Sequence, residues 1–243
     1  MEIITNVEEL GMRSDEVFDV RKEGELVRKT NLTLKTLIKE HNLTSLSAPA
    51  IGVYKRMFVI NFNGDLRCYI NPMIVEAKGL YISKEKCSSL PDKLYIRPRN
   101  TEITASYLTP LGKIETKRFT GMAASVFQHE VDHLDGLLLC DVGLEIDEDF
   151  EKASTDEQAE VIKAYIESLD LKAKEVKKEI EEDKELSELY EAIDLMEEVA
   201  KGNVKLTAGK VKVQEESEEK EDEHDNEQAE RKTSVSSKKN RKH

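Results

Sequence analysis

The chain has 243 residues, which is enough for one or two domains with a substantial core and excludes a small scaffold held together by disulfide bonds. Hydrophobic residues make up 38% and charged residues 36%, with no tryptophan, so part of the length is expected to lie outside a packed core. The formal net charge of -13 argues against a nucleic-acid or anionic-membrane surface spread over the whole chain.

The N-terminal sequence MEIITNVEELGM is acidic where an export signal carries positive charge, so we expect no signal peptide. The longest apolar run, near Gly136 to Cys140, is far shorter than the roughly 20 residues that a membrane-spanning helix needs. Three cysteines are an odd and sparse set for a disulfide framework. We therefore expect a protein of the cytoplasm or of an organelle matrix, with no membrane partner. We also expect a monomer.

The first regular elements are a helix and a hairpin. Leu32 to His41 repeats apolar residues at helical spacing and predicts an amphipathic helix. Met57 to Asn61 and Arg67 to Asn71 are β-rich and flank Asn63-Gly64-Asp65, a turn signal whose glycine tolerates positive φ. The pattern predicts a β-hairpin.

A second hairpin and a second helix follow. Thr101 to Leu108 and Lys113 to Phe119 are predicted strands joined by the Thr109–Gly112 turn. Gly121 to Leu134 returns to helical periodicity, and Gly136 is a typical residue after a helix end. Mixed composition of this kind runs from residue 1 to about 148, which we take as one domain.

The remainder of the chain differs in composition. Ser154 and Glu157 form a capping-box signature, and an intermittent apolar stripe predicts a helical extension over 154–200. Residues 214–243 form an acidic block followed by a short basic block with almost no aliphatic residues. Burial cannot offset the ordering entropy of such a segment, so we expect a disordered charged tail.

The predicted helix over Gly121 to Leu134 carries an H-E-x-x-H pattern. His129 and His133 are one turn apart, so both imidazoles project from one face and can share a metal ion. Glu130 lies about 100° round the helix from His129, at the open side, where it can move protons. The alternative is two surface histidines, but apolar neighbours favour a site at the edge of a core: Met122, Ala123, Val126, Phe127, Val131 and Leu134.

Two histidines do not complete a catalytic metal site, which usually has three protein ligands and one position for water. Cys87 is the candidate third ligand, because it lies in a polar stretch, Glu85 to Pro91, that we interpret as a loop between strands. Cys68 and Cys140 occur in apolar company and are interpreted as core residues.

At these residues the sequence resembles the peptide deformylase family. The family motif Q-H-E-x-D-H-L-x-G is unbroken over Gln128 to Gly136. The E-G-C-x-S motif matches at Glu85, Cys87 and Ser89, with Lys86 in place of its glycine. Order, spacing and the intervening elements agree over residues 1 to about 148.

A third family motif, G-x-G-x-A-A-P-Q, is only partly present. Leu46 to Gly52 lies in register with it, with Leu43 and Ser45 in place of the two glycines and Ala50 in place of the glutamine. The family glutamine donates a hydrogen bond to the developing oxyanion, which alanine cannot do. Loss of one such donor lowers turnover by on the order of 10² to 10³.

The resemblance implies an α+β fold, with strands packed around a central H-E-x-x-H helix and a C-terminal helical extension. It implies a metal-dependent hydrolase that removes the formyl group from N-terminal formyl-methionine of newly made polypeptides. Cys87, His129 and His133 would hold one divalent metal, Fe²⁺ or Zn²⁺, and Glu130 would be the acid and base. The implied partners are formyl-methionyl nascent peptides. The charged tail either contacts ribosomal RNA or protein or is a solubilising segment, which is the more common case.

Residues around the implied substrate follow from the same alignment. The Ser88 N–H would help to bind the oxyanion, and the helix face one turn before His129 would meet the methionine side chain. Glu85 and Asp132 either orient the ligand N–H groups or are capping or solvated carboxylates. The candidate substrate-binding residues are Ser45, Leu46, Lys86, Ser88 and Val126.

Two other functions fit the same residues. One is a different H-E-x-x-H metallohydrolase, such as a peptidase, which would need no cysteine ligand. The other is a weak or inactive deformylase homologue that binds nascent chains or ribosomes, which the loss of the glutamine at Ala50 favours.

Overall fold

A computed structural model describes residues 2–182, 204–207 and 210–213. The chain divides into two compact units, Met1–Leu169 and Asp170–His243. In the described part of the chain, no helix combines the length and the apolar character needed to cross a membrane. The first unit contains the residues that the sequence marks as functional.

The first unit is built on a five-stranded antiparallel sheet with the strand order β1-β2-β3-β6-β7. Both predicted hairpins are present in it, and the first turns at Asn63 and Gly64, which have φ values of 53° and 91°. The strand that follows this turn continues seven residues beyond its predicted end, from Asn71 to Lys78. The strands are β1 (Ser45–Ser47), β2 (Met57–Phe62), β3 (Asp65–Lys78), β6 (Glu102–Leu108) and β7 (Ile114–Thr120).

A second antiparallel sheet has the order β4-β5-β8. Its strands are β4 (Tyr81–Cys87), β5 (Leu90–Arg99) and β8 (Leu144–Ile146). The edge strand β4 pairs only with β5, just as β1 at the edge of the larger sheet pairs only with β2. Each sheet therefore has an edge strand with unpaired backbone groups near the candidate site.

The helices of the first unit include the two that the sequence predicts. The predicted helix at Leu32 to His41 is the second half of α2, which begins at Gly24 and buries Val27, Leu34 and Ile38. The H-E-x-x-H helix is α3, and Gly136 follows it with a φ of 74°. The helices are α1 (Val7–Leu10), α2 (Gly24–Glu40), the 3-10 turn η1 (Pro49–Ile51), α3 (Met122–Leu134), α4 (Leu139–Val142), α5 (Glu148–Lys152) and α6 (Thr155–Glu182).

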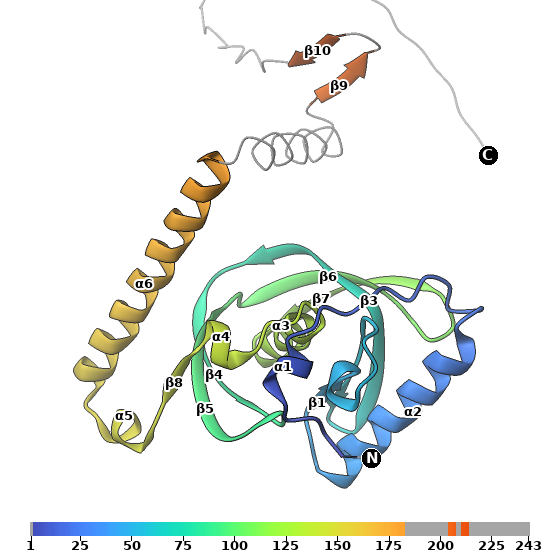
Figure 1. The fold of residues 1–243 in the computed structure, drawn as a ribbon, viewed down its shortest axis with the longest axis horizontal. Coiled ribbons are helices and arrows are strands. Elements are labelled where there is room, and N and C mark those ends of the chain that lie inside the picture. Colours follow the sequence, from blue (N-terminus) through green and yellow to red (C-terminus); the bar gives the residue numbers. More distant parts are fainter. Residues whose placement is uncertain (1, 183–203, 208–209, 214–243) are drawn as a thin grey trace, which may run out of the picture. The chain divides into compact units, whose positions relative to one another are not determined.

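Helix α3 is central to the first unit, and Figure 1 shows the strands of the two sheets curving around it. Its apolar face packs into an aromatic cluster in which the Phe127 ring meets Phe58 edge-on, with centroids 5.0 Å apart. Tyr69 and Phe119 complete this cluster. The α+β architecture with strands around a central H-E-x-x-H helix is confirmed, and the burial of one helix face fixes which side chains point into the site.

Two expectations about cysteines are wrong. Cys87 is not in a loop but is the last residue of β4, where it is buried. Cys140 is exposed rather than in the core, because the apolar run around it folds into the short helix α4, which buries Leu139 instead. Cys68 is buried as expected, and burial raises the pKa of its thiol to about 12.

The extension begins with the expected cap. The Ser154 N–H donates to a Glu157 carboxylate oxygen (2.9 Å), and the Glu157 N–H donates to Ser154 Oγ (3.4 Å). The helix α6 that follows is described as far as Glu182, so residues 183–200 of the predicted extension and the predicted tail at 214–243 lie outside the described residues. In the second unit, β9 (Val204–Thr207) and β10 (Lys210–Val213) form an antiparallel pair.

The first part of α6 belongs to the first unit. The side chain of Tyr165 is buried, and its hydroxyl donates to the Val142 carbonyl (2.7 Å). Gln158 Nε2 donates to the Phe150 carbonyl (2.9 Å). These contacts anchor α6 to the segment that carries α4 and α5.

We predict that truncation after Leu169 leaves the stability of the first unit unchanged, whereas truncation after Phe150 lowers it. The shorter chain loses the buried ring and the hydrogen bond of Tyr165, a loss on the order of 2 kcal/mol in the free energy of unfolding. Urea unfolding of the two truncated proteins measures the difference. Equal midpoints would show that α6 contributes nothing to the unit.

Candidate metal centre

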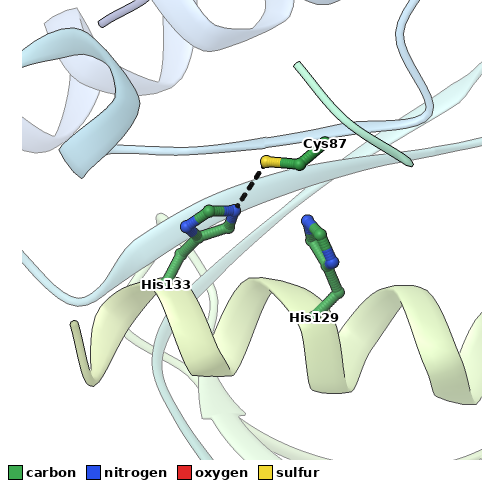
Figure 2. A group of neighbouring side chains, drawn as sticks. All are labelled: Cys87, His129 and His133. Carbon is green, nitrogen blue, oxygen red and sulfur yellow. Dashed lines mark hydrogen bonds between the residues drawn. The ribbon is translucent and has the colours of Figure 1, made fainter. Parts of the chain in front are cut away.

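Cys87, His129 and His133 converge on one point. Figure 2 shows both imidazole rings projecting from the same side of α3 toward the sulfur of Cys87, which lies above them at the end of β4. One ligand atom from each residue lies within 4.8 Å of the other two. The structure therefore brings together the three residues that the sequence singles out as candidate ligands.

The donor set fits a divalent transition metal. Zinc bonds of about 2.3 Å to sulfur and about 2.0 Å to nitrogen give roughly 3.5 Å between sulfur and nitrogen at tetrahedral angles. The distance from Cys87 Sγ to His133 Nε2 is 3.2 Å. A soft thiolate beside two imidazoles suits zinc or iron better than calcium or magnesium.

The two histidines differ in their protonation. Burial lowers the pKa of His133 to about 3, which leaves this imidazole neutral, as a metal ligand has to be. Burial acts in the same direction on His129, but hydrogen bonds with Cys87 and Glu85 raise the pKa of His129 to about 10. Near neutral pH the His129 imidazole is therefore protonated, and a metal ion that binds there has to displace this proton.

Glu85 holds His129 in place. Its Oε2 is 3.0 Å from His129 Nδ1, which leaves Nε2 of that ring to face the centre. Arg99 donates to both oxygens of the Glu85 carboxylate, at 2.7 Å and 2.8 Å. Burial opposes ionisation, but the hydrogen bonds from Arg99 and His129 hold the pKa of Glu85 well below its usual range. Of the two roles open to Glu85 in the sequence, the geometry matches orientation of a ligand N–H.

Asp132 lies one step further out. Its carboxylate forms ion pairs with Arg97 and with Arg99, the latter at 2.5 Å. The Arg99 guanidinium is only 3% exposed, so it links two carboxylates inside the protein. Breaking such a buried pair leaves an uncompensated charge, typically at a cost of about 3 to 5 kcal/mol.

Sequence reasoning missed Arg97 and Arg99. They lie two residues apart on β5, so their side chains leave the same face of the strand toward α3. An R-x-R pattern shortly after the candidate cysteine ligand is the signal that could have identified them. The sequence alone does not indicate that these arginines form ion pairs with Glu85 and Asp132.

Gln128, the first residue of the longest motif, connects α3 to the residue that follows β5. It accepts a hydrogen bond from the Asn100 N–H (3.0 Å) and donates to the Asn100 carbonyl (3.0 Å). It also donates to the Ala124 carbonyl within α3 (3.0 Å). These contacts fasten α3 to the end of β5, next to the buried arginine pairs.

Glu130 is buried beside the centre and is 3% exposed. Among the described residues, its Oε2 has no hydrogen-bond partner. Burial raises the pKa of Glu130, while the charge of His129 and the hydroxyls of Ser45 and Ser47 oppose the shift. An unpartnered carboxylate oxygen with a raised pKa is suited to exchanging a proton with a bound molecule.

The centre opens into a cavity of about 780 Å³. The edge strands β1 and β4 and the first turns of α3 all contribute to its wall, and Glu130 lines it together with the three candidate ligands. Ala50 lines it as well, with no donor in its side chain. Every substrate-binding residue expected from the sequence lines the cavity, namely Ser45, Leu46, Lys86, Ser88 and Val126. Met122 lines it as well.

The family model and the relatives that match this chain all belong to one family. Residues 5–147 match the family model described as polypeptide deformylase. A peptide deformylase of Thermodesulfovibrio yellowstonii is 35% identical over 139 residues, which cover 52% of this chain and 83% of the relative. One from Halothermothrix orenii is 34% identical over 150 residues, which cover 55% of this chain and 97% of the relative.

Solved structures agree. The crystal structure of the peptide deformylase from Thermotoga maritima aligns with a TM-score of 0.55 and 28% identity, over 58% of this chain and 95% of that one. A Plasmodium falciparum peptide deformylase in complex with an inhibitor aligns with a TM-score of 0.52 and 26% identity, over 69% and 97% of the two chains.

The fold and the centre together define a metal-dependent hydrolase built on an H-E-x-x-H helix. The family match covers more than half of the sequence and includes every residue of the centre. The chain belongs to the peptide deformylase family, whose members remove N-formyl groups.

Proposed function

We propose that Cys87, His129 and His133 hold a single divalent cation, Fe²⁺ or Zn²⁺, and that this centre removes the formyl group from N-terminal formyl-methionine of new polypeptides. The convergence of three ligand atoms within 4.8 Å, on the wall of a cavity shared with Glu130, carries the proposal. The bound cation would acidify a water molecule and polarise the formyl carbonyl.

Glu130 is the proton carrier in this proposal. Its carboxylate takes a proton from the attacking water and delivers it to the amine nitrogen as the C–N bond of the formamide breaks. The products are formate and a free N-terminal amine. The raised pKa and the unpartnered Oε2 of Glu130 support the role, because an acid–base group works best with a pKa near the working pH.

The peptide is proposed to dock in an extended conformation between the two sheets. Both β1 and β4 are edge strands that line the cavity, and an edge strand offers unpaired N–H and C=O groups to an extended chain. In this proposal Val126 and Met122, on the first turns of α3, would contact the methionine side chain, and Leu46 of β1 lines the same cavity.

Hydrogen-bond donors for the oxyanion come from around Ala50 rather than from Ala50 itself. We propose the Ser88 N–H as one donor and the hydroxyls of Ser45 and Ser47 as partial substitutes for the missing amide. Ser45, Ser47 and Ser88 all line the cavity. Hydroxyls replace a positioned amide incompletely, so we expect slow turnover.

Replacing Ala50 by Gln is therefore expected to raise kcat for formate release by at least about tenfold, because one removed donor of this type lowers turnover by 10² to 10³. The matched control is Ala50→Glu, whose carboxylate has a similar length but cannot donate when ionised. Steady-state assays of formate release from a formyl-methionyl peptide measure both variants. Unchanged kcat in Ala50→Gln would show that another group already supplies the donor.

The wider assignments are proposals too. We propose a monomer whose catalytic domain spans residues 1–148, followed by a helical extension over 154–200 and a charged tail at 214–243 that contacts the ribosome. We propose that the protein works in the cytoplasm or in an organelle matrix, because a thiolate ligand suits a reducing compartment.

The function is tested by loading anaerobically purified protein in turn with Fe²⁺, Ni²⁺ and Zn²⁺ and measuring formate release from formyl-Met-Ala-Ser, with metal content measured on the same samples. We expect formate and free Met-Ala-Ser. Acetyl-Met-Ala-Ser is the matched control and should remain intact. Release of formyl-methionine instead of formate would identify a peptidase, and no product at any metal loading would identify a binding protein.

A further inference from the structure

Strand β4 contributes two lysines to the lining of the cavity. Along this strand Ser83, Glu85 and Cys87 are buried, whereas Lys84 and Lys86 are exposed. Both lysines nevertheless line the cavity, and Lys86 directly precedes the candidate cysteine ligand. The corresponding position in the motif that this chain resembles is glycine, so the ammonium group is an addition at this point of the wall.

The exposed charge of the cavity wall is positive. The acidic residues in this wall, Glu85 and Glu130, are buried, and Glu85 is neutralised by Arg99. Lys84 forms an ion pair with Glu151 of α5. Among the described residues, Lys86 forms no direct ion pair, but its charge acts on Glu151 together with that of Lys84 and helps to lower the pKa of the Glu151 carboxyl. A lysine without a direct ion pair in this wall contrasts with a net charge of -13 for the whole chain.

The position of Lys86 relative to the candidate metal centre determines which residues of a bound peptide its side chain can contact. The formyl group reacts beside Cys87, so a peptide lying along the edge of β4 leads its next residues past Lys86 and then past Lys84. A lysine side chain is long and flexible, and its ammonium group can reach a carboxylate on a neighbouring extended chain. Opposite charges facing each other across neighbouring strands attract, and like charges repel.

We propose that Lys86 makes this centre select formyl-methionyl peptides with Asp or Glu in the first position after methionine. The inference rests on the proposed deformylase function. It assigns a substrate class to this chain through a residue that plays no part in holding the metal or moving the proton.

The test compares three peptides with amidated C-termini, formyl-Met-Asp-Ala, formyl-Met-Asn-Ala and formyl-Met-Lys-Ala. Asp and Asn have nearly the same shape and differ in charge, and Lys carries the opposite charge. We expect kcat/KM to be about fivefold higher for Asp than for its isostere Asn, and lower again for Lys, in line with a partly exposed charge pair. The preference should weaken as ionic strength rises. Equal kcat/KM for the three peptides would overturn the inference.

Variants assign the preference to the residue. Lys86→Met should abolish the preference for Asp, and Lys86→Glu should reverse it in favour of Lys. Lys113→Glu is the matched control, because it makes the same charge change at an exposed residue next to β7 that does not line the cavity. An Asp preference that survives Lys86→Glu would overturn the inference.

Failure of the inference and failure of the proposed function give different results. Formate release with equal rates on all peptides leaves the function intact and rejects the inference. If no formate is released, the function is rejected, and calorimetric titration with the amides of Met-Asp-Ala and Met-Asn-Ala reads the selectivity directly. About fivefold tighter binding of the Asp peptide supports the inference, and equal binding or no binding of either peptide overturns it.

Discussion

Replacing Glu130 by Gln is expected to abolish formate release while leaving the metal bound. The amide keeps the shape of the carboxylate but cannot take a proton from water, and a positioned acid–base group typically contributes 10² to 10⁴ in rate. We therefore expect kcat to fall by at least about 10² with one metal ion still present per chain. Formate assays and elemental analysis of the same sample measure both quantities.

Glu148→Gln is the matched control for this change, because Glu148 is exposed on α5 and lies outside the cavity wall. Its activity should equal that of the unchanged protein. Loss of the metal in Glu130→Gln would make Glu130 a structural residue. Turnover close to that of the unchanged protein would remove it from the proton-transfer step.

Replacing Cys87 by Ala is expected to empty the centre. Two imidazoles from one helix turn remain, and the loss of a direct ligand should weaken metal binding by more than the 10- to 100-fold that follows loss of an outer hydrogen-bond partner. Formate release should fall in parallel with metal content. Competition with a chromogenic chelator measures the affinity.

Cys140→Ala controls for this variant, since Cys140 is an exposed thiol outside the cluster of candidate ligands. It should keep full metal content and activity. A Cys87→Ala protein with full metal occupancy and activity would instead support an H-E-x-x-H hydrolase without a sulfur ligand.

The local features of the fold could be predicted because they depend on neighbouring residues. A glycine at Gly64 fits the left-handed turn of the first hairpin, and both strands pair as their patterns indicate. The spacing of His129 and His133 follows from the geometry of one helix turn. The apolar residues around them correctly predicted a helix with one buried face.

The features that could not be predicted depend on contacts distant in sequence. From the sequence, Glu85 is expected to be a polar loop residue. Its burial is explained by Arg99, which lies on the neighbouring strand β5 and neutralises the carboxylate. The pairing of β4 with β5 makes this segment a strand, and Cys87 is buried at its end. The Arg97 and Arg99 ion pairs with Asp132 join β5 to α3, and no local pattern connects residues more than thirty positions apart.

The residues that depart from the family motifs change the chemistry of the cavity wall in this chain. Ala50 removes a donor from the cavity wall, while Ser45 and Ser47 add hydroxyls to it and Lys86 adds an ammonium. Their positions along the chain were clear from the alignment. That all four face one cavity with Glu130 required the fold.

X-ray absorption spectroscopy at the edge of the bound metal counts the sulfur and nitrogen neighbours of the ion and so identifies its ligands. We expect one sulfur and two imidazole nitrogens bound to the metal in the wild-type protein, and no sulfur in a Cys87→Ser variant loaded with excess metal. A wild-type metal without a sulfur neighbour, or a sulfur neighbour that persists in the variant, would exclude Cys87 as a ligand.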